Sequence, residues 1–236
     1  MKMKIIIILV IFIVILIFSY SIMNKEEINY SILGDKELFS NNIISKNFSD
    51  LIYDELDKEN NFGFYSKDFI FDNARIIDII NDIKDNKSID GFHIQNMLKR
   101  TNILILNVGE NEIYYKLSTV NDDENRIFKY LDEVFDDYLL LLDIIKRYND
   151  GKIIVLGYYN NTNDKHNDKY YKYMNNMIYR YCKNHDLLYI DSFEILNNNS
   201  DYLTNNTPTY VTNEGNLALF NKIYNKINKL YLHKNY

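Results

Sequence analysis

The chain has 236 residues, of which 47% are hydrophobic and 25% are charged, and its formal net charge is -6 at pH 7. Its 22 Tyr and 13 Phe residues can build a core, which excludes a disordered chain. The 27 Lys and Arg residues form no basic stripe, which argues against a nucleic-acid partner. The single cysteine, Cys182, excludes an intramolecular disulfide, a Cys-rich zinc site and a lipid-modified cysteine near the N-terminus.

The N-terminus carries an unbroken apolar run over residues 5–18, which continues more weakly to Met23. A helix over residues 5–22 would rise about 27 Å, close to the hydrocarbon thickness of a bilayer. Lysines before the run and glutamates after it favour a short cytoplasmic N-terminus. We therefore predict one N-terminal transmembrane helix, a membrane anchor over residues 1–23, and an extracytoplasmic domain over residues 24–236.

A cleaved signal peptide is the competing interpretation of this segment. Ser19-Tyr20-Ser21 is a weak small-x-small match, but the apolar run is long for the hydrophobic region of a signal peptide. Both interpretations place the domain outside the cytoplasm.

Short apolar runs alternate with longer helical patterns in the rest of the chain, which is typical of a parallel sheet built from βαβ units. Strands are predicted over residues 29–33, 68–71, 103–108, 152–157 and 187–190. Amphipathic helices are predicted over residues 48–56, 76–83, 94–98, 127–145, 170–181 and 217–232. The acidic run over residues 121–125 predicts a helix start.

The predicted fold is one flavodoxin-like, three-layer α/β/α sandwich with a five-stranded parallel sheet in the order 2-1-3-4-5 and residues 103–108 central. Ligands of such sheets bind beyond the carboxyl ends of the strands. Function is therefore expected in the loops over residues 34–40, 72–75, 109–114 and 158–163.

Four segments at these strand ends and before the last helix carry a resemblance: YSILGDKEL, LILNVGENEI, IIVLGYYN and TPTYVTNEGNLALF. In order and spacing they resemble the blocks of the SGNH (GDSL) hydrolases, most closely the membrane-anchored proteins of low-GC Gram-positive bacteria. That family's first block is Gly-Asp-Ser-Leu, its third is Gly-x-Asn-Asp, and its last contains Asp-x-x-His-Pro. The resemblance covers nearly the whole ectodomain and implies a sandwich of the SGNH hydrolase type.

The resemblance also implies roles for individual residues. Gly34 and Asp35 match the first block, but Lys36 occupies the position of the nucleophilic serine. Gly109 and Asn111 match the third block, which implies an oxyanion-hole donor at the asparagine.

The other two blocks depart further from the family. The glycine of the second block falls at Asp72 or Asn73. In the last block, Tyr210 falls at the histidine, and Thr207 or Pro208 falls at the aspartate. No family catalytic residue is intact under this alignment.

Acyl transfer needs a hydroxyl or thiol whose proton is taken by an adjacent, oriented base. Lys36 has no hydroxyl, and the four histidines, His93, His166, His185 and His233, lie outside the last block. Because loss of a nucleophile or base in such a triad costs about 10⁶ in turnover, we expect little or no esterase activity.

The charged residues at the strand ends allow alternative roles. Lys36 could be a nucleophilic or Schiff-base lysine, but acidic neighbours favour a salt bridge. Asp35, Asp72, Glu110 and Glu112 could hold a hard cation, but their spacing matches no known loop, so solvated loop acids are the default and no metal or cofactor is predicted.

Two tyrosine pairs, Tyr114-Tyr115 and Tyr158-Tyr159, fall in predicted strand-end loops. Exposed aromatics there could stack on a sugar or line a groove for a partner, although chance placement among so many tyrosines explains them equally well.

The sequence thus predicts a membrane-anchored, extracytoplasmic SGNH-like domain that is catalytically inactive and acts as a binding or accessory module at the cell envelope, toward glycan, lipid or an envelope protein. The alternatives are an active esterase, lysophospholipase or glycan deacetylase with relocated catalytic residues, and a purely structural anchor. We also predict that Lys36, Asn111 and Tyr210 meet at the carboxyl end of the sheet, with the lysine nearest Glu110 or Glu112 and no Ser-His pair there.

Overall fold

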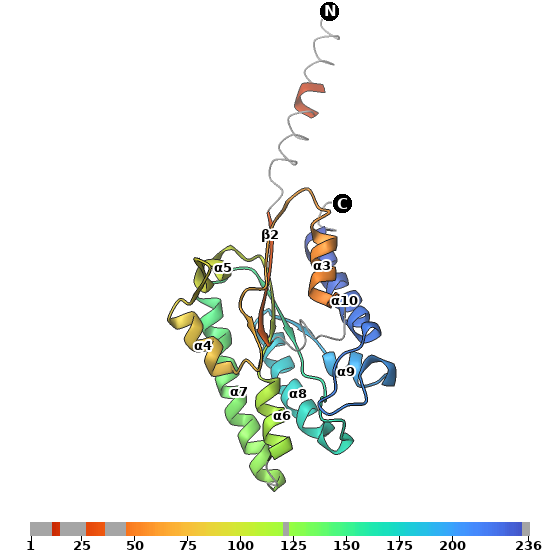
Figure 1. The fold of residues 1–236 in the computed structure, drawn as a ribbon. Coiled ribbons are helices and arrows are strands. Elements are labelled where there is room, and N and C mark those ends of the chain that lie inside the picture. The colour runs from red at the N-terminus through yellow and green to blue at the C-terminus, as the bar shows by residue number, and fades with distance from the viewer. Residues whose placement is uncertain (1–10, 15–26, 36–45, 120–122, 233–236) are drawn as a thin grey trace, which may run out of the picture.

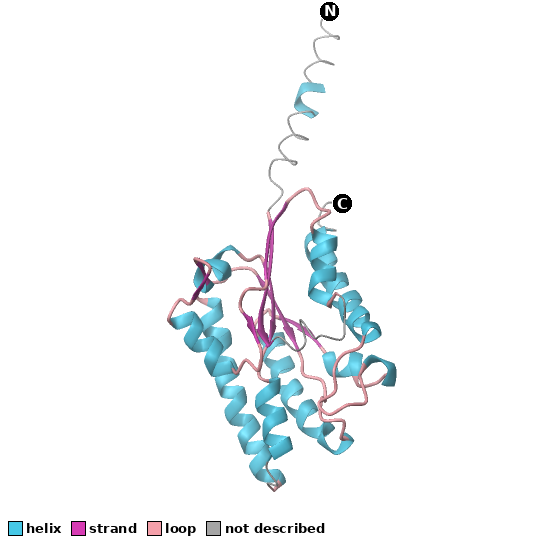
Figure 2. Ribbon diagram, viewed as in Figure 1, coloured by secondary structure: helices cyan, strands magenta, loops and turns pink. Residues whose placement is uncertain are grey.

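The protein, as a computed structural model, places its main sheet between two layers of helices (Figures 1 and 2). The structure describes residues 11–14, 27–35, 46–119 and 123–232. The main sheet contains β1 (Ile28–Asp35), β2 (Phe62–Ser66), β3 (Ile70–Phe71), β6 (Ile103–Asn107), β7 (Lys152–Leu156) and β8 (Leu188–Ile190). Its order is β2-β1-β6-β7-β8, with β3 also paired to β1, and every pair is parallel.

The sheet has six strands, so the predicted count of five is wrong. Strands β2 and β3 follow one another along the same edge of β1, where β2 pairs with Ile28–Ser31 and β3 pairs with Gly34–Asp35. The missed strand β2 is a half-buried edge strand interrupted by Gly63, and it lacks the continuous apolar run of a central strand. The five predicted strands correspond to β1, β3, β6, β7 and β8. Their predicted order, with β6 in the centre, is confirmed.

Alternation along the central strand divides the core between the two faces of the sheet. Leu104 and Leu106 pack with the layer that holds α4 (Ile76–Lys84), α5 (Ile94–Arg100), α7 (Glu124–Lys146) and α8 (Asp168–Asn184). Ile103 and Ile105 pack with the layer that holds α3 (Phe48–Leu56) and α10 (Asn213–Ile227). Because successive strand side chains point to opposite faces, an uninterrupted apolar run is what a strand covered on both sides requires.

The six predicted helices all form, and polar side chains start several of them. Asn47 caps α3, Thr212 caps α10, and Asp123 caps α7, which confirms the helix start predicted from the acidic run. The helix predicted over residues 217–232 ends in the π-helical turn η3 (Asn228–Leu232). The elements that were not predicted are α6 (Glu110–Thr119), the hairpin of β4 (Ser88–Ile89) and β5 (Phe92–His93), α9 (Ser192–Leu196), and the 3₁₀ turns η1 (Lys165–Asn167) and η2 (Ser200–Tyr202).

The N-terminal segment is described only at residues 11–14, which are helical and about half exposed, at 47–59%. The rest of the predicted anchor, residues 1–23, lies outside the described residues. Within the described part of the chain, no helix combines the length and the apolar character that crossing a bilayer requires.

Candidate functional site

The carboxyl ends of the parallel strands bring the predicted blocks to one edge of the sheet. Strand β1 ends in Asp35, β3 is followed by Asp72 and Asn73, and β6 is followed by Val108 and α6. Lys36 follows Asp35 directly and lies outside the described residues, so its predicted neighbourhood stays a prediction.

Gly34 allows β1 and β6 to approach closely at this edge. Its φ is +131°, and a Cβ atom there would lie 1.8 Å from the carbonyl oxygen of Asn107, the residue with which Gly34 pairs. Only glycine fits both the backbone conformation and this distance. The matching glycine of the first block therefore has a packing reason to be present.

Asp35 and Asn111 join the first and third blocks. Asp35 is only 2% exposed, and the Asn111 side-chain amide donates a hydrogen bond to its Oδ2. Asn111 lies in the first turn of α6, whose start at Glu110 replaces the loop predicted over residues 109–114. The amide thus bonds a buried carboxylate and not its own backbone.

Glu112 links the third block to the second. Its Oε1 accepts a hydrogen bond of 2.7 Å from the backbone N–H of Ile76, the first residue of α4. Burial raises the pKa of Glu112, while the Ile76 N–H and the Arg75 charge oppose the shift. The carboxylate therefore accepts a hydrogen bond from an N–H that has no partner within the helix, and its negative charge interacts favourably with the positive N-terminal end of the helix dipole.

The acids at this edge are not the solvated loop residues expected as the default. Asp35 and Glu110 are buried, at 2% and 6% exposure, and only Asp72 is exposed. Helices cover both faces of the sheet, and α6 begins at this edge, so the Asp35 and Glu110 carboxylates are enclosed. Among the described residues, no group of three or more His, Cys, Asp or Glu side chains is arranged to hold a metal ion.

The turns of the second and third blocks each contain a residue with a positive φ. Asn73 has a φ of +57°, in the left-handed region that glycine favours and that asparagine tolerates better than most residues. Gly109 in the third block has a φ of +104°, and a Cβ atom there would lie 2.6 Å from the Tyr158 hydroxyl. Both turns therefore have a positive φ, although only one of them contains a glycine.

The last block docks on the loop after β7. The backbone N–H of Thr209 donates to the Asn161 carbonyl at 2.8 Å, and the Tyr159 hydroxyl donates to the Thr209 carbonyl at 3.3 Å. Thr207 is exposed, and the Tyr210 backbone pairs with Thr204. The segment therefore reaches the carboxyl end of the sheet.

The predicted meeting of side chains is only partly seen. Asp35 and Asn111 are brought together. No hydrogen bond or ring contact joins the half-buried Tyr210 side chain to either of them within the described part of the chain.

The tyrosine pairs do not form one exposed aromatic surface. Tyr158 and Tyr159 are buried, at 0% and 2% exposure, and the Tyr158 hydroxyl donates to the Val108 carbonyl at 2.8 Å. Tyr115 is 68% exposed and Tyr114 is half-buried. The expectation of exposed aromatics thus fails for the pair after β7, because both rings are enclosed and the Tyr158 hydroxyl bonds the carbonyl of the residue that follows β6.

The histidines supply a pair that sequence reasoning missed. His166 Nδ1 lies 2.9 Å from Asp164 Oδ1 in the loop between β7 and α8, and hydrogen bonds from the His166 backbone N–H and then from its ring lower the pKa of Asp164. His93 and His185 bond backbone carbonyls of Asn86 and Tyr181. The signal available in the sequence was an aspartate two residues before a histidine. The His166 side chain is 94% exposed, and no described hydroxyl or thiol contacts it.

We predict that Asn111→Ala lowers the free energy of unfolding by about 2 kcal/mol, because the buried Asp35 carboxylate loses a charge-assisted hydrogen bond. Urea unfolding at pH 7 measures the change. Asn81→Ala, on the exposed face of α4, is the matched control and should change stability by less than about 0.5 kcal/mol. Equal stability of Asn111→Ala and the unsubstituted protein would contradict this role for the amide.

Comparison with known proteins identifies the architecture. No model of a protein family matches the chain, and no curated relative does. Among solved structures, a member of the lipolytic protein G-D-S-L family from Veillonella parvula is 13% identical with a TM-score of 0.61, covering 83% of this chain and 96% of that one. The lipase Lip_vut3 from a goat rumen metagenome is 15% identical with a TM-score of 0.68, covering 83% and 95%.

A third solved structure belongs to an enzyme with a named substrate. A catalytic mutant of Axe2, an acetylxylan esterase from Geobacillus stearothermophilus, is 10% identical with a TM-score of 0.64, covering 86% of this chain and 96% of that one. Together these matches show that the chain has the SGNH (GDSL) hydrolase fold, in agreement with the resemblance of its motifs.

Proposed function

We propose that this protein is a membrane-anchored, extracytoplasmic SGNH-like domain that binds a ligand at the cell envelope and does not hydrolyse esters. The fold supports a hydrolase-like domain, and its solved neighbours include lipolytic enzymes and an acetylxylan esterase. The residues at the family's catalytic positions argue against turnover in this chain.

One observation carries the proposal. Each described histidine pairs with a backbone carbonyl or with Asp164, and none contacts a hydroxyl or thiol that it could activate. The sequence places Lys36 at the nucleophile position and Tyr210 at the base position. An acyl-transfer mechanism needs a nucleophile and a base in contact, and no such serine–histidine pair forms within the described part of the chain.

The state of Asn111 supports the same conclusion. In the family this residue implies an oxyanion-hole donor, but here its amide donates to the buried Asp35 carboxylate. A negative charge beside the donor opposes the oxyanion that forms in acyl transfer.

An anchor at the N-terminus would orient the domain with its strand-end edge away from the membrane. Strand β1 begins at Ile28, and the four residues between it and the predicted anchor span at most about 14 Å. The eight residues of β1 then extend about 26 Å toward the opposite edge. This geometry favours a ligand in the envelope outside the membrane over a lipid of the protein's own bilayer.

The test is hydrolysis of short acyl p-nitrophenyl esters by the full chain in detergent, with an active GDSL lipase as positive control. We expect no turnover above background. The double substitution Lys36→Ser with Tyr210→His should gain at most slight activity, because the aspartate of the last block and the glycine of the second block are still missing. Ready hydrolysis by the unsubstituted chain would overturn the proposal.

A second candidate function is an active esterase with a relocated base, and the Asp164–His166 pair favours it. The pair follows β7 at the edge where the family's chemistry occurs. If the chain does hydrolyse esters, His166→Ala should abolish turnover under this alternative, and His185→Ala, near the amino end of β8, should not.

A further inference from the structure

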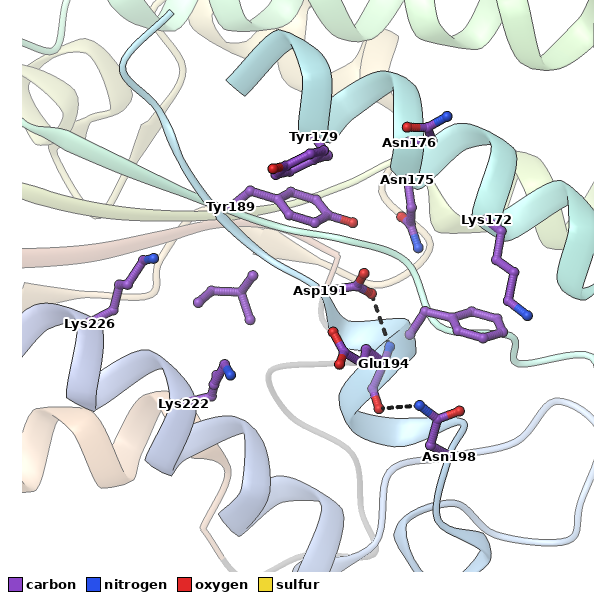
Figure 3. A pocket seen from close by; sticks show the side chains of 12 residues that line it. Lys172, Asn175, Asn176, Tyr179, Tyr189, Asp191, Glu194, Asn198, Lys222 and Lys226 are labelled. Atoms are coloured by element: carbon purple, nitrogen blue, oxygen red, sulfur yellow. Dashed lines mark hydrogen bonds between the residues drawn. The ribbon is translucent and has the colours of Figure 1, made fainter. Parts of the chain in front are cut away.

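A groove runs beside β8, the strand at the end of the sheet opposite β2 (Figure 3). It has a volume of about 650 Å³ and lies between α8 and α10, with β8 and α9 at its base. Strand β8 is separated from the central β6 by β7, so the groove lies about 10 Å to the side of the candidate site. A volume of this size holds a ligand of a few hundred daltons.

One wall of the groove is aromatic. Tyr179 on α8 is 46% exposed and packs at a tilt against Tyr189 of β8, with ring centroids 5.6 Å apart. Figure 3 shows the Tyr179 ring above that of Tyr189 at the groove. The contact holds the exposed ring in place, and a fixed aromatic face with a polar tip suits the apolar face of a sugar ring.

The opposite wall is cationic. Lys222 and Lys226 lie four residues apart on α10, both are exposed, and neither forms an ion pair within the described part of the chain. A third lysine, Lys172, belongs to α8, the helix that carries Tyr179, and lies over the Phe193 ring at 4.8 Å. Two ammonium groups one helical turn apart can bind one anionic group between them.

The groove's acids limit how much negative charge it can take. Asp191 caps α9 by accepting from the Glu194 N–H at 3.0 Å, and the Glu194 side chain is exposed. Three lysines against two carboxylates leave one excess positive charge among the lining residues. A ligand with one anionic group per unit therefore fits better than a polyanion. The exposed Asn176 amide adds a donor and an acceptor for hydroxyl groups.

We propose that this groove binds an acidic glycan unit, with a sugar ring on Tyr179, its carboxylate or phosphate between Lys222 and Lys226, and hydroxyls on Asn176. This inference rests on the proposed binding role at the cell envelope, and it assigns the ligand to a surface separate from the strand-end site. The groove is lined by residues of α8, α9, α10 and β8 and the turns between them, and by none of the four sequence blocks at the strand ends. It is therefore separate from the part of the fold that the resemblance to hydrolases concerns.

The experiment is a binding titration of the full chain in detergent by calorimetry. A galacturonic acid trimer is the carboxylate probe, glucose 6-phosphate is the phosphate probe, maltotriose is the neutral probe, and inorganic phosphate tests the anion alone. We expect one or both acidic saccharides to bind, with an affinity that falls as salt is raised, and maltotriose and inorganic phosphate to bind at least about tenfold more weakly.

Substitutions separate the two walls. Lys222→Glu with Lys226→Glu should weaken the acidic probe at least about tenfold, and Tyr179→Ala should weaken it about fivefold or more. The matched controls are Lys84→Glu at the exposed end of α4 and Tyr115→Ala on α6, and both should leave the affinity within about twofold. Unchanged unfolding midpoints show that the exposed substitutions leave the fold intact.

Three outcomes would overturn the inference. The first is that neither acidic probe binds. The second is that the lysine and tyrosine substitutions leave binding unchanged. The third is that the chain forms a dimer that Tyr179→Ala dissociates, which would assign the β8 edge to a second copy. None of these results bears on ester hydrolysis, so failure of the groove and failure of the non-catalytic function are distinguishable.

Discussion

Replacement of Gly34 by alanine is expected to lower the free energy of unfolding by more than about 4 kcal/mol. The new Cβ atom would lie 1.8 Å from the carbonyl oxygen of Asn107 and 2.6 Å from its carbonyl carbon. These are backbone atoms of the central strand, so relief requires β1 and β6 to separate. The φ of +131° adds strain for any residue with a side chain.

Gly91→Ala is the matched control for this substitution. Gly91 also has a positive φ, +82°, but an added Cβ atom meets nothing within 4 Å. It should therefore cost only the backbone strain, about 1 to 2 kcal/mol. Urea unfolding at pH 7 measures both, and equal losses for the two variants would show that the contact between β1 and β6 does not govern the effect at Gly34.

A steep loss of stability above about pH 10 is the second large effect expected. The hydroxyls of Tyr30, Tyr138, Tyr158 and Tyr171 are enclosed in the protein, and burial raises the pKa of each well above its ordinary value. In the unfolded chain these groups ionise near pH 10. Their stabilising contribution is thus complete below pH 10 and is lost as the pH rises toward the folded pKa.

The expected slope follows from proton linkage. Each buried tyrosine that ionises only on unfolding lowers the free energy of unfolding by about 1.4 kcal/mol per pH unit above pH 10, so four of them give about 5.5 kcal/mol per unit. Burial also raises the pKa of the Cys182 thiol to about 12. Because a thiol in the unfolded chain ionises at about pH 8.5, the stability that this group contributes begins to fall at a lower pH than that of the tyrosines. Urea unfolding between pH 8 and pH 11, with tyrosinate absorbance followed in parallel, measures this range.

Tyr138→Phe isolates one contributor. The Tyr138 hydroxyl is buried and has no hydrogen-bond partner among the described residues, so its removal should be neutral or stabilising at pH 7. The alkaline slope of this variant should be shallower by about 1.4 kcal/mol per pH unit. A slope equal to that of the unsubstituted protein, or tyrosinate absorbance that rises well before unfolding, would contradict the enclosure of these hydroxyls.

The arrangement of the sheet could be derived from the sequence because its central strands are recognisable locally. The runs around Ile103–Asn107 and Lys152–Leu156 are apolar at successive positions, which only a strand covered on both faces needs. Right-handed crossovers then leave few possible orders. The edge strand β2 escaped prediction, because half-buried side chains and a glycine interrupt the same signal.

The candidate site could be predicted only in part. The order of the blocks placed Gly34, Asp35, Gly109 and Asn111 at one edge, and the structure joins Asp35 to Asn111 there. The position of Lys36 relative to this pair is still a prediction, and no hydrogen bond or ring contact within the described part of the chain joins the Tyr210 side chain to it. The motifs identified these residues but not their hydrogen-bond partners. Asp35 and Asn111 are 76 positions apart in the chain, and a hydrogen bond between such distant residues leaves no local pattern in the sequence.

By itself, then, the sequence determined the α/β fold class and the order of the sheet, because periodicity and crossover handedness are properties of the chain. Only the tertiary structure decided that Asp35 and Tyr158 are buried, that His166 pairs with Asp164, and that Tyr179 faces Lys222 across a groove. Burial and pairing depend on which distant segments cover a side chain, and that covering follows from the packing of the helices on the sheet.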